Sequence, residues 1–206
     1  KIGRRNYGFG KIIINVTKRR KSEEFHKNKD YGLAHLMGPA LIVKVYHKLS
    51  DTKDIDIEEL KHCSSFPGQA VMDNHIYYNE NPIIGHLPVS NTDMNDANLS
   101  VSKSINYDDR NIAYLQYGLI YKEIPLEEYI KHEEEHWHAY RNEGIGFGLF
   151  IGGLEDCIKE KSNNKFFERY TNDLRAPQHA KDREIIFKLF GLDANLDYQG
   201  NLELSK

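Results

Sequence analysis

The chain has 206 residues, 39% of them hydrophobic and 29% charged, and a formal net charge of −3 at pH 7. These values are typical of a single globular domain and exclude a disordered chain. No apolar run approaches the roughly 18 residues of a membrane-spanning helix, and the first residues lack the order of a signal peptide, so we expect a soluble domain that does not bind membranes.

The charge is distributed unevenly along the chain. Residues 1–21 carry eight Lys or Arg and no acidic residue, which leaves 20 basic and 31 acidic residues, or −11, for residues 22–206. We therefore expect a basic N-terminal arm on an acidic body, which argues against a nucleic-acid partner. Cys63 and Cys157 form no C-x-x-C pattern, so two buried free thiols are expected rather than a disulfide or a thiolate metal site.

The first part of the chain alternates between apolar and polar runs. Residues 12–16 are β-branched and predict a strand. Residues 22–50 have a helical character that is interrupted near Gly38 and Pro39. Residues 54–62 predict a short helix that ends in a turn.

Later segments have a weaker pattern. Residues 69–78 are predicted to be extended, and residues 88–110, which are rich in Asn, Asp and Ser, predict a long surface loop. Residues 112–121 form a strand-like run, and a helix is predicted to begin at Pro125. The polar residues 193–206 are expected to be a frayed tail.

The helix predicted after Pro125 carries the motif H-E-x-x-H. His132 and His136 are four residues apart, so both imidazoles lie on one face and can bind one metal ion. Glu133 lies about 100° from His132 around the helix, where a carboxylate can act as a general base on metal-bound water. The neighbouring Glu134 and Glu135 leave a second interpretation open, in which the motif is a solvated acidic face.

A hydrolytic zinc site needs three protein ligands and one open position, so a third ligand must come from elsewhere in the chain. Spacing alone does not choose among the downstream candidates, which are Glu155, Asp156, Glu168, Asp173 and His179.

Two segments follow the motif. Residues 144–154, GIGFGLFIGGL, are apolar and rich in glycine, and residues 166–172, FFERYTN, contain an aromatic-x-E pattern. Together with H-E-x-x-H, these segments resemble the zincin-like metallopeptidase domains at the C-termini of Rhs-type polymorphic toxins.

The resemblance implies an α+β fold with a small sheet packed on a metal-binding helix, followed by further helices, in a single zincin-like domain over residues 1–206. It implies Zn²⁺ bound by His132, His136 and Glu168, with Glu133 as the general base of a metallopeptidase. It also implies a toxin or effector domain delivered as part of a larger secreted bacterial polypeptide, with which the missing initial Met agrees. The expected partners are a protein or peptide substrate and an immunity or inhibitor protein.

Two alternatives remain open at this stage. The first is a zincin-shaped module that binds a partner without catalysis. The second is a nuclease toxin domain that uses the histidines and the basic arm.

Overall fold

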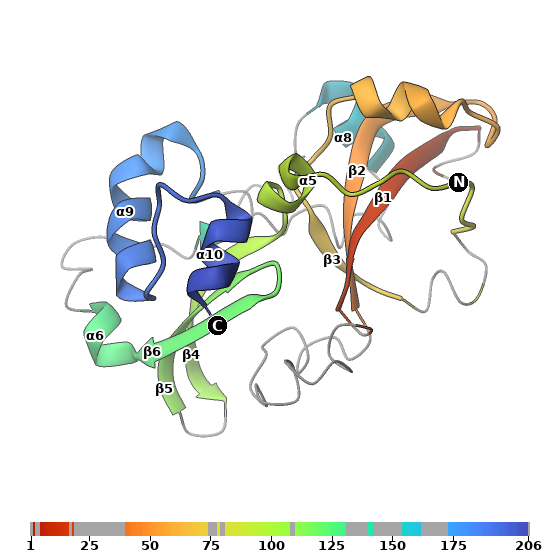
Figure 1. Ribbon diagram of the computed structural model, residues 1–206. Helices are drawn as coiled ribbons and strands as arrows, with labels where there is room; N and C mark the ends of the chain where they lie inside the picture. Colours follow the sequence, from red (N-terminus) through yellow and green to blue (C-terminus); the bar gives the residue numbers. More distant parts are fainter. Residues whose placement is uncertain are drawn as a thin grey trace.

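The computed structural model describes residues 2, 5–16, 18, 40–73, 78, 81–107, 110–130, 140–141, 154–161 and 173–205. These residues form two antiparallel sheets and several short helices, which confirms the α+β class. The two sheets lie side by side, each with its own helices (Figure 1). This arrangement does not confirm a zincin fold.

The first sheet has the strand order β1-β2-β3. Its strands are β1 (Tyr7–Asn15), β2 (Ala40–Ser50) and β3 (Gln69–Met72). The strand expected at residues 12–16 and the extended start of residues 69–78 are confirmed. The helical prediction is wrong for residues 40–50, because β2 is the central strand and is largely buried on both faces. A strand of this kind has no alternating pattern, and its β-branched residues favour the pleated conformation.

Two short helices pack against the first sheet. The 3₁₀ helix η1 (Ile57–His62) begins after Asp56, whose side chain accepts a hydrogen bond from the N–H of Glu58, and it matches the short helix expected at residues 54–62. Helix α8 (Leu154–Glu160) contacts β2 and buries Cys157. Cys157 and Cys63 are both free thiols, as expected, but Cys63 is only partly buried.

The second sheet has the strand order β6-β5-β4-β7. Its strands are β4 (Leu99–Tyr107), β5 (Arg110–Tyr117), β6 (Ile120–Pro125) and β7 (Tyr140–Arg141), and helix α5 (Asn91–Asn95) precedes them. The prediction of a surface loop at residues 88–110 is therefore wrong. Strand β4 pairs on both sides, and its serines Ser100 and Ser102 are buried together with Leu99 and Val101.

The strand-like run at residues 112–121 is the hairpin of β5 and β6, which turns at Gly118. Gly118 has a φ of +55°, a conformation that favours glycine. A Cβ at this position would also meet the ring of Tyr198 at 2.8 Å. The turn thus depends on glycine for both its backbone conformation and its packing.

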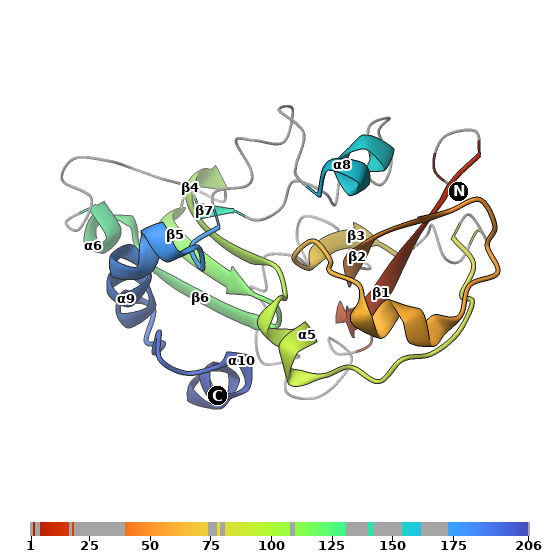
Figure 2. The ribbon, with the colours of Figure 1, turned by 90° about the horizontal axis from the view of Figure 1, so that it is seen from above.

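Helices cover the second sheet (Figure 2). They are α6 (Leu126–Ile130), the 3₁₀ helix η3 (Pro177–His179), α9 (Ala180–Leu189) and α10 (Tyr198–Leu204). Helix α6 confirms the helix start after Pro125, whereas residues 131–139 lie outside the described residues. The tail expected to fray contains α10, which is capped by Asp197 and buries Tyr198 completely.

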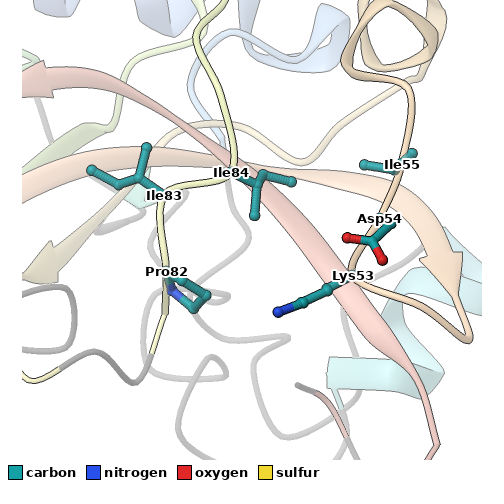
Figure 3. A pocket seen from close by; sticks show the side chains of 6 residues that line it. All are labelled: Lys53, Asp54, Ile55, Pro82, Ile83 and Ile84. Carbon is teal, nitrogen blue, oxygen red and sulfur yellow. The ribbon is translucent and has the colours of Figure 1, made fainter.

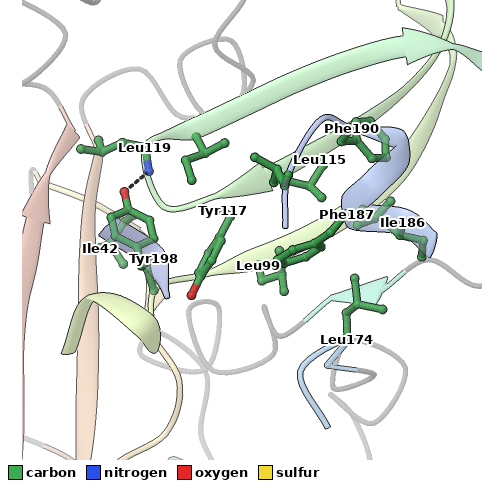
Figure 4. Close-up of a cluster of buried hydrophobic side chains, with 14 of the residues drawn as sticks. Ile42, Leu99, Leu115, Tyr117, Leu119, Leu174, Ile186, Phe187, Phe190 and Tyr198 are labelled. Atoms are coloured by element: carbon green, nitrogen blue, oxygen red, sulfur yellow. Dashed lines mark hydrogen bonds between the residues drawn. The ribbon is translucent and has the colours of Figure 1, made fainter. Parts of the chain in front are cut away.

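Tyr198 connects three parts of the core (Figure 4). Its hydroxyl accepts a hydrogen bond of 2.9 Å from the N–H of Leu119, and its own N–H donates to the side chain of Asn95 at 2.9 Å. The surrounding cluster includes Ile42 of the first sheet and Phe187 of α9. One hydrophobic core therefore joins both sheets to the C-terminal helices.

We predict that Tyr198→Phe lowers the free energy of unfolding by about 1–3 kcal/mol, because it leaves the buried N–H of Leu119 without its acceptor. Urea denaturation measures the loss. Tyr78→Phe is the matched control, since Tyr78 is 77% exposed and its replacement should change stability by less than about 0.5 kcal/mol. Equal stability of the two variants would show that the tail does not depend on this bond.

Candidate functional site

The predicted metal site lies outside the described residues. This holds for His132, His136 and Glu168 as ligands and for Glu133 as the base, so the ligand set and the zinc ion stay predictions from the sequence.

Two alternative third ligands lie on α8. Glu155 accepts hydrogen bonds of 2.6 Å from the side chains of Asn6 and Lys159. Asp156 is exposed. Neither side chain lies in a cluster of metal-ligating groups within the described ranges.

The other two alternatives lie before and within η3. Asp173 forms an ion pair with Arg175 at 2.9 Å, and Nδ1 of His179 is 3.5 Å from the carboxylate of Asp182. Among the residues that the structure describes, no three His, Cys, Asp or Glu side chains are arranged to hold a metal ion.

A buried ion cluster lies between the first sheet and α5. Lys11 of β1 and Lys44 of β2 are directly opposite each other, an arrangement of like charges that is unfavourable by itself. Asp93 compensates both: its carboxylate oxygens are 2.7 Å from Nζ of Lys11 and 3.3 Å from Nζ of Lys44. Asp96 adds a contact of 2.8 Å to Lys44. The paired charges make the burial of Lys44 and Asp93 tolerable.

Asp93 also caps α5. The N–H and the hydroxyl of Ser90 donate to its carboxylate at 2.8 and 2.9 Å, and the N–H of Asp93 donates to the Ser90 hydroxyl at 3.1 Å. Burial raises the pKa of Asp93, but the hydrogen bonds from Lys11 and Ser90 outweigh it and lower the pKa to about 2. With this low pKa, Asp93 stays ionised at neutral pH. Burial, together with the charge of Asp93, raises the pKa of Tyr46 to about 12.

Residues 82–89, PIIGHLPV, form an exposed segment that we call the apolar arm. It lies beside β1 and η1 in both overall views (Figures 1 and 2). Nζ of Lys11 donates to the carbonyl of Pro88 at 2.6 Å, and Leu87 packs on a small cluster formed by Phe9, Tyr46 and Leu60. The C-terminal end of the arm is thus attached to the ion cluster and to a hydrophobic cluster.

Residues 51–56 lie opposite the arm and form what we call the acidic loop. Ile55 packs on the same small cluster as Leu87, so one cluster anchors both segments. An open groove of about 520 Å³ lies between them. Its walls are Lys53, Asp54, Ile55, Pro82, Ile83 and Ile84 (Figure 3).

The groove combines apolar side chains with one acidic and one basic residue, Asp54 and Lys53. Ile55 and Ile84 point toward each other across it (Figure 3). The isoleucines of the arm are strongly exposed, Ile83 by 72% and Ile84 by 44%. Residues 51–60 contain five acidic residues and one Lys, a net charge of −4. A surface with these properties is suited to binding another protein.

The comparisons with known proteins agree with a binding role. A family model described as Immunity protein 26 matches residues 1–111, more than half of the chain, and the chain therefore belongs to this family. No curated protein and no solved structure matches it. The matched range contains the ion cluster, the acidic loop and the apolar arm, and it ends before the H-E-x-x-H motif.

This membership corrects the interpretation based on residues 130–172. The chain is a member of an immunity protein family and not a zincin-like metallopeptidase domain of a toxin, so the predicted hydrolase activity is wrong. An immunity protein has a toxin as its partner, which replaces the predicted peptide substrate. Within the described ranges, no helix has the length and hydrophobicity needed to cross a bilayer.

Sequence reasoning missed the groove, although signals were present. Ile83 and Ile84 stand between Pro82 and Pro88, which makes a central strand improbable and an exposed extended segment reasonable. The sequence S-x-x-D at Ser90 marked the start of α5. The pairing of Asp93 with two lysines has no signature in the sequence, because it depends on the β1–β2 register.

We predict that Asp93→Asn lowers the free energy of unfolding at pH 7 by about 3 kcal/mol, because it leaves two partly buried lysines without their shared partner. The pKa of Asp93 is lower in the folded state than its ordinary value of 3.8, so its contribution is complete above that pH and is lost as the pH falls toward 2. The wild type should therefore lose more stability than the variant between about pH 4 and pH 2.

Chemical denaturation at a series of pH values measures this difference. Asp51→Asn is the control, because Asp51 is exposed and its replacement should leave stability within about 0.5 kcal/mol. Parallel pH profiles for the wild type and Asp93→Asn would contradict the assignment.

Proposed function

We propose that this protein binds a protein toxin and neutralises it by occupying part of its surface, without breaking bonds in it. The observation that carries the proposal is the family match over residues 1–111. The groove within the matched range supports it, because inhibition by occlusion needs affinity and shape rather than catalytic groups.

The predicted delivery as part of a larger secreted polypeptide rested only on the resemblance to toxin domains. Because the chain belongs to an immunity protein family, that resemblance no longer supports the predicted delivery. Zinc bound by His132, His136 and Glu168 stays part of the proposal only as a structural ion, with no role in hydrolysis. Elemental analysis of the purified wild type beside His136→Ala tests whether the ion is present.

A selection in bacterial cells tests the proposed function. Fragments of the source genome are expressed with and without this protein, and fragments that kill only in its absence are recovered. We expect at least one such fragment to encode a toxin domain that binds the purified protein. If no toxic fragment is tolerated better in the presence of the wild-type chain, the proposed function is wrong.

We further predict that Glu133→Gln protects cells as well as the wild type does. A metallopeptidase would lose several orders of magnitude of activity without its general base, whereas a binding protein loses nothing at this position. Survival curves of cells that express the recovered toxin together with either variant measure the difference. Loss of protection in Glu133→Gln, with unchanged expression and folding, would contradict neutralisation by binding alone.

A further inference from the structure

The groove has a chemical character that narrows the kind of partner segment it accepts. We infer that it binds an extended segment of the toxin that contains both basic and apolar residues. This inference rests on the proposed function for the identity of the partner, and on the groove itself for the chemistry of the contact.

The apolar part of the inference comes from the two walls. Ile84 is 44% exposed and points toward Ile55 across the groove (Figure 3). Val89, farther along the arm, is also 44% exposed. Large apolar side chains that stay exposed on a well-anchored segment gain free energy when a partner covers them. A partner segment must therefore bring apolar side chains to this surface.

The basic part comes from the acidic loop, whose residue Asp54 lines the groove beside Lys53. Glu58 and Glu59 of η1 are already paired with Lys61 and Lys48. Asp51 and Asp54, by contrast, are exposed and form no ion pair with any described residue.

These two aspartates carry the available negative charge of the loop, which exceeds the single positive charge of Lys53. Lys or Arg side chains on the partner would complement this charge and accelerate association.

The extended conformation follows from the main chain of the arm. Residues 82–87 make no hydrogen bond to another described residue, and all of them except Leu87 are exposed. Exposed peptide groups on a fixed segment can pair with an extended chain in the manner of strand addition. Attachment at Leu87 and Pro88 holds the arm in place before binding, which reduces the entropy cost of ordering it.

The probe is a short synthetic peptide in which Lys and Leu alternate, compared with a peptide of the same length in which Glu and Leu alternate. Fluorescence anisotropy measures their binding to the wild type, Ile84→Asp and Asp54→Lys. We expect the wild type to bind the Lys–Leu peptide more tightly than the Glu–Leu peptide. Each variant should lower the affinity for the Lys–Leu peptide by about tenfold or more.

Matched controls lie on α9, away from the groove. Ile185→Asp replaces an isoleucine that is 49% exposed, and Glu184→Lys reverses an exposed charge. Both controls should bind the Lys–Leu peptide as the wild type does. Thermal unfolding of all four variants verifies that they are folded.

The results separate this inference from the proposed function. Equal binding of the two peptides overturns the inference, and so does unchanged binding of the Lys–Leu peptide to Ile84→Asp and Asp54→Lys. A wild-type dimer that Ile84→Asp dissociates also overturns it, because a second copy of the chain would then occupy the groove. The same variants are tested for protection against the recovered toxin. If they protect as well as the wild type, the toxin binds elsewhere and the inference fails while the function stands. If the wild type protects against no toxin, the function fails, and the peptides alone decide the chemistry of the groove.

Discussion

The ion pair network of Asp93 is the interaction on which the arrangement of the binding surface depends. The register of β1 and β2 places Lys11 and Lys44 opposite each other, and one carboxylate neutralises both. Because Asp93 also forms the capping box of α5 with the N-cap residue Ser90, the same carboxylate ties the start of α5 to the first sheet. Lys11 then extends the network to the carbonyl of Pro88, so the position of the apolar arm follows from the same charges.

The part of the chain beyond the family match completes the structure that the matched part begins. Strand β4 lies within residues 1–111, but its partner β5 lies almost entirely outside, and β5 supplies the long pairing from Leu99 to Ser104. The C-terminal helices close the core through Tyr198 and Phe187. The matched residues therefore carry the candidate surface, while the remaining described residues stabilise the sheet and core behind it. Such an arrangement suits an inhibitor, because binding groups that are already in place reduce the entropy cost of association.

The strand at residues 12–16 and the helix start after Pro125 could be predicted because local pattern determines each of them, whereas the α+β class was implied by the resemblance. Strand β2 was mistaken for helix because a central strand buried on both faces shows no period of two. Strand β4 was mistaken for a loop because Ser100 and Ser102 are buried in a strand that pairs with β5 and β7, which composition does not reveal. The functional prediction relied on a short motif and a local resemblance, whereas the family match depends on the first 111 residues, where the sequence offered no recognisable motif. The groove is formed by segments about thirty residues apart that both pack on Phe9, Tyr46 and Leu60, a contact that no local pattern reveals.

The central claim is that the protein neutralises a toxin by binding and not by hydrolysis. The most direct test titrates a fixed amount of active toxin with the purified protein. Residual toxin activity and the intact mass of the toxin are measured at each step. The account predicts that activity falls in proportion to the protein added, reaches zero near a fixed stoichiometric ratio, and returns when the complex is dissociated, with the toxin mass unchanged. Complete inactivation by a small fraction of that amount, accompanied by toxin fragments, would contradict it.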